Sequence, residues 1–359
     1  MALTQVDGGL LSPTNAQYTG FKNRLINGAM VIDQRNAGAS VTSSASGAQY
    51  ATDRWMMQAT QSSKMTGQQN AGAVTPPVGF TNYNGITSSS AYSIVSTDYF
   101  LLSQAIEANN MVDLGWGGAS ASAATLSFWV RSSLTGTFGG ALENGTDRSF
   151  PFSFTINSAN TWEQKTISIS APASGGTWGT GNSAGVFVRF GLGVGSTYSG
   201  TAGAWASSRY FSATGATSVV GTNTATFYIT GVQLEKGSTA TSFDYRPYGT
   251  ELALCQRYYW RITGSANYTA GSGVSTGATA TNFHVKYPTS MRTSPTFSQS
   301  NTAVNIGSTA INVTSIVQSF TGNDTALVQT GVAAGLTATQ GAIWVLNTTS
   351  SYVDASAEL

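Results

Sequence analysis

The 359-residue chain has little charge, almost no cysteine or histidine, and no long apolar run. Charged residues make up 9% of it, against roughly 25% in an average soluble domain. The formal net charge is +1, so bulk electrostatics do not draw the chain to nucleic acid or to an anionic membrane. Because no stretch reaches the roughly 20 apolar residues of a transmembrane helix, we expect no membrane insertion.

The single cysteine, Cys255, excludes an intrachain disulfide, so packing or oligomerisation must hold the fold. A thiol nucleophile needs a paired base, and we interpret Cys255 as a small buried residue instead. The only histidine, His284, lies in a predicted strand without a second ligand cluster, which disfavours a His-based triad or a His-rich metal site. The start of the chain lacks a basic n-region and an apolar core, which favours synthesis in a cytoplasm.

Nucleotide and metal motifs are also missing from the sequence. There is no P-loop and no G-x-S-x-G elbow, and GLGVGS at 191–196 ends a predicted strand rather than opening a helix. Turns rich in Asn and Asp would suit Ca²⁺, yet neither an EF-hand nor a nonapeptide repeat is present. We therefore name no metal ligand and expect no cofactor.

What the sequence does contain is small polar residues, 41 glycines and 11% aromatics, a composition typical of short strands joined by many turns. Several runs alternate with a period of two, as where Leu126, Phe128 and Val130 share one face. The predicted strands cover 25–35, 53–60, 91–107, 124–133, 137–144, 149–157, 163–170, 185–195, 225–235, 283–297, 303–320, 326–335 and 341–349. Long amphipathic helices are absent, so the sequence predicts an all-β protein built of antiparallel β-sandwiches.

The length suits two domains. We expect an N-terminal arm over 1–21 that is ordered only against a partner. A jelly-roll-like sandwich over 22–249 and a second β-sandwich over 250–359 follow in tandem. At the boundary, ELALCQRYYWRI at 251–262 predicts one or two helical turns leading into a strand, with Thr250 as a candidate N-cap.

One stretch around this boundary is charged like an average protein. Between Gln233 and Arg261 it carries 7 charges in 29 residues. An isolated charge at a strand end is costly unless it is paired. We therefore expect ion pairs and backbone hydrogen bonds to fix the inter-domain joint. The charged residues in question are Glu235, Asp244, Arg246 and Arg257, and the aromatic residues expected around them are Phe243, Tyr245, Tyr258 and Trp260.

The segments NRLINGAMVIDQRNAGASVT, YATDRW, TLSFWVR and FYITGVQLEKGSTATSFDYRPYGTELALCQRYYWR resemble a carbohydrate-binding-module-like jelly roll of bacteriophage virion proteins. YPTSMRTSPTF and DASAEL resemble the C-terminal β domain that often follows it in phage tail-fibre proteins. The resemblance covers most of 22–359. It implies a non-enzymatic, adhesive and commonly trimeric virion component. Such a protein would assemble in the host cytoplasm and attach to other virion proteins, which we assign to residues 1–21.

Four aromatic residues in Gly- and Ser-rich loops are the candidate glycan contacts: Trp116, Trp178, Tyr198 and Trp205. A loop exposes a large ring to solvent, where the apolar face of a saccharide can stack on it. The same rings could instead anchor their loops or be buried in a subunit contact. We therefore expect a tail-fibre protein that recognises host-surface polysaccharide. The alternative is a capsid-decoration or head-fibre protein with a purely structural role.

A capsule depolymerase is a second alternative, because glycosidic hydrolysis needs two carboxylates about 5–10 Å apart. The candidate carboxylates are scattered through the first domain: Asp98, Glu107, Asp113, Glu143, Asp147 and Glu163. No pair has an obvious neighbour that would tune its pKa. The irregular runs do not predict the parallel β-helix that usually carries such an activity. We therefore expect no enzymatic activity.

Overall fold

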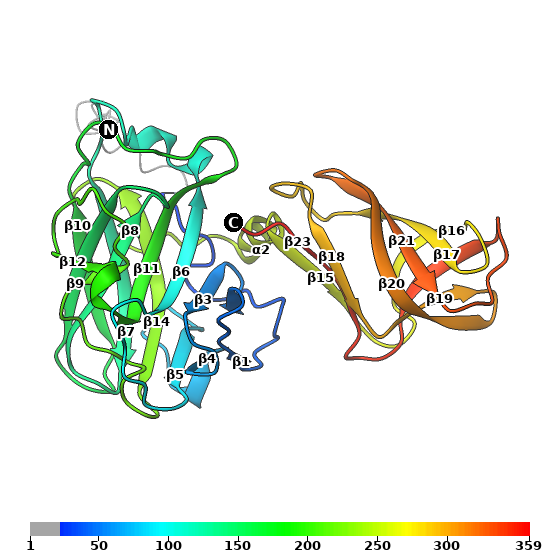
Figure 1. Cartoon of the computed structure of the whole chain (residues 1–359), viewed down its shortest axis with the longest axis horizontal. Coiled ribbons are helices and arrows are strands. Elements are labelled where there is room, and N and C mark those ends of the chain that lie inside the picture. The colour runs from blue at the N-terminus through cyan, green and yellow to red at the C-terminus, as the bar shows by residue number, and fades with distance from the viewer. Residues whose placement is uncertain (1–21) are drawn as a thin grey trace, which may run out of the picture.

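The computed structural model describes residues 22–359 as two β-rich units with helix α2 (Tyr248–Gln256) between them (Figure 1). The predicted all-β class is confirmed. Strand pairing within the described residues is antiparallel, except for the short parallel pair β12 (Ser199–Gly200) and β13 (Ser212–Ala213). The arm expected over 1–21 lies outside the described residues. Within 22–359, no helix has the length and apolar character needed to cross a membrane.

The first unit is a sandwich of two six-stranded sheets. One sheet has the order β1 (Val41–Thr42), β4 (Met65–Gln69), β5 (Asn84–Ser88), β14 (Thr226–Lys236), β7 (Ala124–Ser132) and β10 (Glu163–Ile169). The other has the order β2 (Gln49–Thr52), β3 (Trp55–Ala59), β6 (Tyr99–Glu107), β11 (Ala184–Val194), β8 (Gly136–Glu143) and β9 (Ser149–Ile156). Their facing sides enclose one core.

The alternation predicted in β7 and β11 builds this core. Leu126, Phe128 and Val130 of β7 are fully buried, as is Phe190 of β11. Phe128 meets Phe154 and Phe190 edge-to-face, with ring centroids 5.0 Å apart in both cases. Truncating a buried ring of this kind to alanine costs about 3–5 kcal/mol, because a cavity replaces it.

The outer face of the second sheet is also covered, which explains why burial along β6 does not alternate. Part of the cover is the segment 195–213, which carries β12 and β13. Ser212 of this segment lies so close that a Cβ on Gly139 or Gly191 would come within 2.4 or 2.6 Å of its Oγ. Glycine is therefore required at both positions for the segment to seat on β8 and β11.

The second unit contains a three-stranded sheet in the order β15 (Tyr259–Thr263), β23 (Tyr352–Ser356) and β18 (Thr296–Ser300). It also contains a closed barrel in the order β16 (Thr269–Ser275), β17 (Ala280–Lys286), β21 (Thr325–Val332), β20 (Thr309–Thr321), β19 (Thr302–Ile306) and β22 (Gly341–Leu346). The second sandwich expected from the sequence thus takes the form of a barrel. Closure follows from β20, a 13-residue strand with two bulges that pairs with both β19 and β21.

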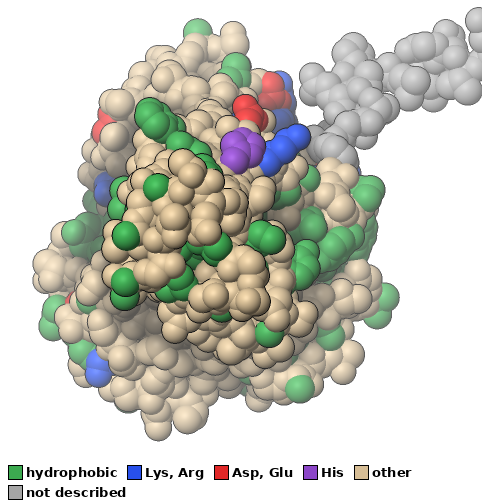
Figure 2. All heavy atoms as spheres, turned by 90° about the vertical axis from the view of Figure 1, so that its right-hand side faces the viewer, with side chains coloured by type: hydrophobic (Ala, Val, Ile, Leu, Met, Phe, Trp, Pro, Cys, Tyr) green, Lys and Arg blue, Asp and Glu red, His purple; other side chains and the backbone are tan. Residues whose placement is uncertain are grey.

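The surface of the barrel reflects the low charge of the chain. Viewed from the barrel end, acidic and basic side chains are sparse, and most of the visible surface is backbone and uncharged, non-hydrophobic side chains (Figure 2). Hydrophobic side chains are scattered over this face rather than gathered into one patch. The barrel core itself is aromatic, with Phe283 stacked on Trp344 at 5.7 Å between ring centroids.

The strand predicted over 25–35 is wrong, because this segment consists of bends and turns. Asn27 and Met30 have positive φ angles of 57° and 58°, which a strand does not accommodate. The Asn27 side chain takes the place of a strand partner. Its Oδ1 accepts from the Ile32 N–H at 3.0 Å, and its Nδ2 donates to the Ile32 carbonyl at 2.8 Å.

Helix α2 begins earlier than predicted. Its N-cap is Pro247, and Thr250 lies inside the helix, so the prediction of Thr250 as the N-cap is wrong. The carbonyl oxygen of Pro247 accepts from the backbone N–H groups of Thr250 and Glu251 at 3.0 and 3.1 Å. The predicted passage from a short helix into a strand is confirmed by β15.

Candidate functional site

Three loops of the first unit bring the predicted tryptophans together. Trp116 lies between β6 and β7, Trp178 between β10 and β11, and Trp205 between β12 and β13. The junctions after β6 and before β11 are at the end of the sandwich drawn uppermost in Figure 1. Gly117 permits the approach of two loops: it has a φ of +90°, and a Cβ there would lie 2.5 Å from Trp178 Cδ1.

The three indole rings form one cluster. Ring centroids are 5.4 Å apart for Trp116 and Trp178, 5.4 Å for Trp116 and Trp205, and 5.9 Å for Trp178 and Trp205. All three rings are half-buried and pack against the sandwich core, with Trp205 also 5.5 Å from Phe150. The cluster therefore closes the end of the core while leaving part of its ring surface exposed.

The polar atoms of the three rings are already used within the protein. Each indole N–H donates to a backbone carbonyl: that of Trp116 to Ser122 at 2.7 Å, that of Trp178 to Gly175 at 3.0 Å, and that of Trp205 to Ser170, just after β10, at 2.7 Å. A buried or half-buried indole N–H normally needs such a partner. What the cluster offers to a ligand is thus ring surface rather than hydrogen-bond donors.

A pocket of about 280 Å³ opens beside two of these rings. Trp116 and Trp178 form one wall, and Met111 and Val112 belong to the other lining residues. We call it the Trp116–Trp178 pocket. Trp205 does not line it but supports the two wall rings. The sequence indicated the aromatic residues through their Gly-rich loops, whereas nothing local indicated Met111 and Val112.

Tyr198 lies apart from this cluster. Its ring stacks on Phe211 at 4.8 Å with an interplanar angle of 11°, and meets Tyr99 edge-to-face at 5.5 Å. Tyr99 is the first residue of β6, whereas the Trp cluster lies beyond the other end of that strand. Tyr198 therefore serves the segment that covers the second sheet, and the structure does not bring it to the pocket.

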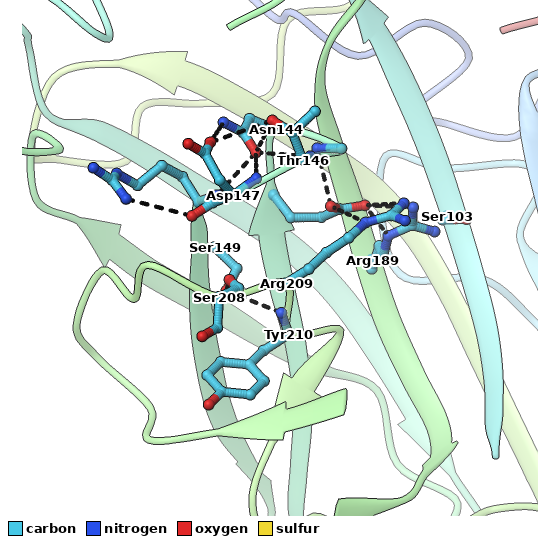
Figure 3. Close-up of polar contacts among 12 residues, drawn as sticks. Ser103, Asn144, Thr146, Asp147, Ser149, Arg189, Ser208, Arg209 and Tyr210 are labelled. Atoms are coloured by element: carbon cyan, nitrogen blue, oxygen red, sulfur yellow. Dashed lines mark hydrogen bonds and ion pairs between the residues drawn. The ribbon is translucent and has the colours of Figure 1, made fainter. Parts of the chain in front are cut away.

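Under the same covering segment lies a cluster of charged residues (Figure 3). Glu143 is fully buried and accepts from Arg189 Nε and Nη2 at 2.7 and 2.5 Å, and from Arg209 Nε at 2.9 Å. Burial alone would raise the pKa of Glu143, but the two guanidinium groups outweigh it and lower that pKa. The arrangement holds the carboxylate ionised and leaves it no role as a proton donor.

The other candidate carboxylates are also engaged, each by its own partner: Asp98 by Tyr92, Glu107 by Arg257, Asp113 by Arg24, Asp147 by Asn144, and Glu163 by Lys165. Burial opposes ionisation of Glu163, yet hydrogen bonds from Lys165 and two backbone N–H groups lower its pKa to about 2. The pKa values of Asp98 and Asp147 are lowered as well. A glycosidase acid needs a raised pKa instead.

Raised carboxyl pKa values occur at Asp33 and Asp53, which lie near the joint between the units. Burial is the main cause in both, and it raises the pKa of Asp53 to about 6. Gln34 opposes the shift by donating its Nε2–H to Asp53 Oδ2 at 2.6 Å. The same amide nitrogen donates to the Tyr259 carbonyl at 2.9 Å. Asp53 therefore positions a side chain that connects the two units.

The raised pKa of Asp53 predicts a pH-dependent stability. Because the folded-state pKa exceeds the ordinary value of 3.8, the protonated group stabilises the fold below that value, and the contribution is lost as pH rises through about 6. As the pH falls from 7 to 5, we expect the unfolding free energy of the unaltered protein to increase by about 1 kcal/mol relative to that of Asp53→Asn. Chemical denaturation at each pH measures it.

Asp98→Asn is the control, because the pKa of Asp98 is shifted in the opposite direction to that of Asp53. The Asp98 pKa is lowered, because hydrogen bonds from Val95, Thr60 and Tyr92 outweigh burial. Its stabilisation is present above the ordinary value of 3.8 and is lost as pH falls through the lower folded-state pKa. The difference in unfolding free energy between Asp98→Asn and the unaltered protein should therefore stay constant from pH 7 to pH 5. Parallel pH profiles for Asp53→Asn and the unaltered protein would contradict the assignment.

Two of the four charged residues expected at the joint form ion pairs. Arg257 binds Glu107 through two parallel hydrogen bonds of 2.8 and 2.9 Å, connecting the residue after α2 to the end of β6. Arg246 contacts Glu251 at 3.3 Å and donates to the Leu25 carbonyl at 3.0 Å. These pairs connect α2 to the first unit.

The other two charged residues, Asp244 and Glu235, bind backbone N–H groups of the first unit. Asp244 Oδ2 accepts from the backbone N–H groups of Lys22 and Asn23 at 2.9 and 3.1 Å. Glu235 accepts from the Thr241 N–H at 2.8 Å and so closes the turn after β14. Both residues act within the first unit rather than between the units.

The expected aromatic packing divides in the same way. Phe243 and Tyr245 surround Phe80 on the first unit, with ring centroids 5.1 and 5.6 Å from it. Trp260 packs in the core of the second unit. Tyr258 lies in the joint, beneath the Arg54 guanidinium at 3.5 Å. Only Tyr258 of the four therefore contributes directly to the contact between units.

Sequence reasoning missed the central contact of the joint. Glu358, one residue from the C-terminus, forms ion pairs with Arg54 and with Arg35, the latter at 2.8 Å. The Arg35 guanidinium also lies 3.5 Å from the centre of the Tyr259 ring. Charged residues more than 300 positions apart have no shared local pattern, so nothing in the sequence could have paired them.

Cys255 and His284 show no catalytic arrangement. Cys255 is fully buried, and burial raises its thiol pKa well above the ordinary value. His284 is exposed on β17. Within residues 22–359, no three His, Cys, Asp or Glu side chains gather as metal ligands would.

Comparison with known proteins gives limited likenesses. No family model and no curated protein matches the sequence. Among solved structures, the chain is similar to the enzymatically active domain of bacteriophage CBA120 tailspike protein 4, with 13% identity over 60% of this chain and a TM-score of 0.33. The match spans 21% of the tailspike chain.

Carbohydrate-binding modules are also among the similar structures. TmCBM61 in complex with β-1,4-galactotriose has 10% identity over 60% of this chain and 99% of its own, with a TM-score of 0.30. A family 11 module from Clostridium thermocellum, in complex with a β-1,3-1,4-mixed-linked tetrasaccharide, has 10% identity over 54% of this chain and 91% of its own. Its TM-score is 0.27. Likenesses at this level carry no argument about the function of this chain.

Proposed function

We propose that this protein is a phage virion fibre component that binds host-surface saccharides through the Trp116–Trp178 pocket and does not cleave them. The pocket walled by two indole rings is the observation that carries the proposal. The sequence resemblance to tail-fibre proteins supports the virion assignment, and with it assembly as a homotrimer attached through residues 1–21. Three pockets on one particle component would act together, so that weak single-site binding becomes strong adsorption.

The chemistry of the pocket suits a saccharide. The C–H face of a sugar ring is apolar and flat enough to pack on an indole, and Trp116 and Trp178 offer two such surfaces. Because the indole N–H groups are engaged by the backbone, the rings are held in place before a ligand arrives. A prearranged wall avoids the entropy cost of ordering side chains on binding.

The carboxylates support binding without cleavage. Hydrolysis of a glycosidic bond needs one acid with a raised pKa and a second carboxylate as base or nucleophile. The pKa values of Asp98, Glu143, Asp147 and Glu163 are all lowered, and each of these carboxylates is engaged by neighbouring donors. Asp33 and Asp53, whose pKa values are raised, lie near the joint rather than at the pocket.

One observation favours the structural alternative, a capsid-decoration or head-fibre protein. The three tryptophans pack on the sandwich core and close its end, which is sufficient reason for them to be there. On that reading, replacing them would reduce stability without a specific effect on adsorption. Stability and binding must therefore be measured on the same variants.

Trp178→Ala is expected to weaken binding to host polysaccharide by at least about tenfold, because half of the aromatic wall is removed. Binding is measured by calorimetric titration with polysaccharide purified from host cells, and folding by thermal unfolding. Trp162→Ala is the matched control. Trp162 is another half-buried tryptophan, with its N–H on the Thr75 carbonyl at 2.9 Å and its ring 5.5 Å from Tyr83, and it does not line the pocket.

The control separates the two functions. Under the proposal, Trp178→Ala loses binding and Trp162→Ala keeps it, even where both variants lose similar stability. If both variants bind as the unaltered protein does, the Trp116–Trp178 pocket is not the saccharide site. If the triple replacement of Trp116, Trp178 and Trp205 by alanine also leaves adsorption to host cells unchanged, the glycan role of these loops is excluded.

A further inference from the structure

The Trp116–Trp178 pocket has an apolar interior and a nearly apolar rim. Ala108 and Met111 are buried lining residues, and Gly185 adds only backbone to the same region. At the opening, Val112 exposes 72% of its surface and Thr180 is also exposed. None of the described residues that line the pocket carries a charge.

Two backbone N–H groups of the interior are already engaged within the protein. The Ala108 N–H donates to the Ser183 carbonyl at 2.9 Å, and the Met111 N–H donates to the Ala108 carbonyl at 2.9 Å. Thr180 has the one side-chain hydroxyl among the described lining residues, and this hydroxyl has no hydrogen-bond partner among residues 22–359. Among the side chains that line the pocket, a ligand group therefore meets carbon atoms inside and one free hydroxyl at the opening.

The volume limits what can enter. Small-molecule sites usually span about 300–1,000 Å³, and this pocket lies just below that range at about 280 Å³. It suits one saccharide unit, or one unit with its substituent, rather than an extended length of chain. Selectivity is therefore decided by the chemistry of a single sugar unit.

We propose that the pocket selects a neutral sugar unit that carries a methyl group, as an N-acetylated hexosamine or a 6-deoxyhexose does. This inference rests on the proposed function. The indole wall of Trp116 and Trp178 takes the ring face, and Ala108 and Met111 receive the methyl group. One methyl group in an apolar pocket changes affinity by about tenfold or more. A sugar carboxylate would lose its water without gaining a counter-charge, so acidic sugars are excluded.

The test uses the full chain and four trisaccharides, each titrated by calorimetry. The probes are the β-1,4-linked trimers of glucose, N-acetylglucosamine and glucuronic acid, and a rhamnose trimer. We expect the N-acetylated trimer, the 6-deoxy trimer or both to bind about tenfold more tightly than the glucose trimer, and the acidic trimer not to bind. The N-acetyl and 6-deoxy arms identify which methyl source the pocket accepts.

A variant at the opening tests the site itself. Val112→Asp places a charge beside the methyl group and should abolish the preference, whereas Val112→Ile should keep it. Val78→Asp is the matched control: it charges another exposed valine, 100% accessible, that precedes β5 and lies away from the pocket. Since both valines are exposed, neither change should disturb folding.

The outcomes distinguish this inference from the proposed function. Equal affinity for the glucose, N-acetylated and 6-deoxy trimers overturns the methyl selectivity but leaves saccharide binding in place. Binding of none of the trimers, together with Trp178-dependent binding of host polysaccharide, also overturns the selectivity alone. If neither trimers nor host polysaccharide bind, both proposals are overturned.

Discussion

Replacing Arg189 by methionine is expected to lower the free energy of unfolding by about 3 kcal/mol, because Glu143 is left buried without its main partner. The Arg189 and Glu143 side chains expose only 3% and 0% of their surface, so water cannot replace the lost hydrogen bonds. Breaking a buried ion pair typically costs about 3–5 kcal/mol. The lower figure applies here, because Arg209 still donates to Glu143 at 2.9 Å.

Arg209→Met is the matched control for this variant. Both arginines bind the same carboxylate (Figure 3), but the Arg209 side chain is 43% exposed. An exposed partner contributes about 0–1 kcal/mol, because solvent screens the pair and competes for its hydrogen bonds. Urea denaturation of the two variants should thus give clearly unequal losses. Equal losses would mean that pairing with the buried carboxylate is not what stabilises this part of the fold.

The same cluster connects the fold to the binding site. Arg209 belongs to the segment that covers the second sheet, and Trp205 lies four residues before it. Trp205 in turn supports the two rings that wall the pocket. A loosened covering segment would therefore disturb the pocket from behind. In the Arg209→Met variant, reduced binding with nearly unchanged stability would reveal this connection.

The strands of the sandwich that could be predicted are those whose sequence alternates. Leu126, Phe128 and Val130 mark β7 because one face of that strand meets the core. Strands such as β16, with the sequence TAGSGVS, contain too few apolar residues to show any period. Their pairing is decided by neighbours far away in the chain, and the sequence of the strand itself does not record it. The strand predicted over 25–35 is wrong although its sequence is apolar, because the buried side chain of Asn27 imposes a turn on it.

For the candidate site as for the fold, the sequence predicts the local features but not the contacts between distant segments. Gly-rich surroundings indicated that Trp116, Trp178 and Trp205 lie in loops, and the structure places all three in loops. Which loops meet depends on strand order, so the sequence could not distinguish these rings from Tyr198, which packs elsewhere. The charged stretch indicated a joint with ion pairs at Arg246 and Arg257, but it did not identify their partners Glu251 and Glu107. The contact of Glu358 with the first unit could not be anticipated at all.

Replacing Arg54 by methionine is expected to be about as damaging as the Arg189 change, and to separate the two units. The Arg54 side chain is 2% exposed, pairs with Glu358, and donates to the Ala105 carbonyl at 2.7 Å. Its guanidinium also covers the Tyr258 ring at 3.5 Å. Removing it leaves the Glu358 carboxylate in the joint with Arg35 as its remaining partner. We expect a loss of about 3 kcal/mol from this contact.

The loss should change the form of unfolding as well as its midpoint. Two units that share a strong contact unfold together, whereas units without it unfold independently. Calorimetry of Arg54→Met should therefore resolve two transitions where the unaltered protein shows one. Limited proteolysis should then cut at the α2 region. Glu358→Gln, which keeps the size of the side chain but removes its charge, should act in the same direction from the other unit.

A surface ion pair of the first unit supplies the matched control for Arg54. Arg24 and Asp113 are 2.6 Å apart, but their side chains are 20% and 48% exposed, so Arg24→Met should cost about 0–1 kcal/mol and leave a single transition. Both changes remove one arginine and one ion pair, and they differ in burial and in whether the pair crosses the joint. If Arg54→Met also unfolds in one transition at the midpoint of the control, the units are held by their aromatic packing, and Glu358 is dispensable.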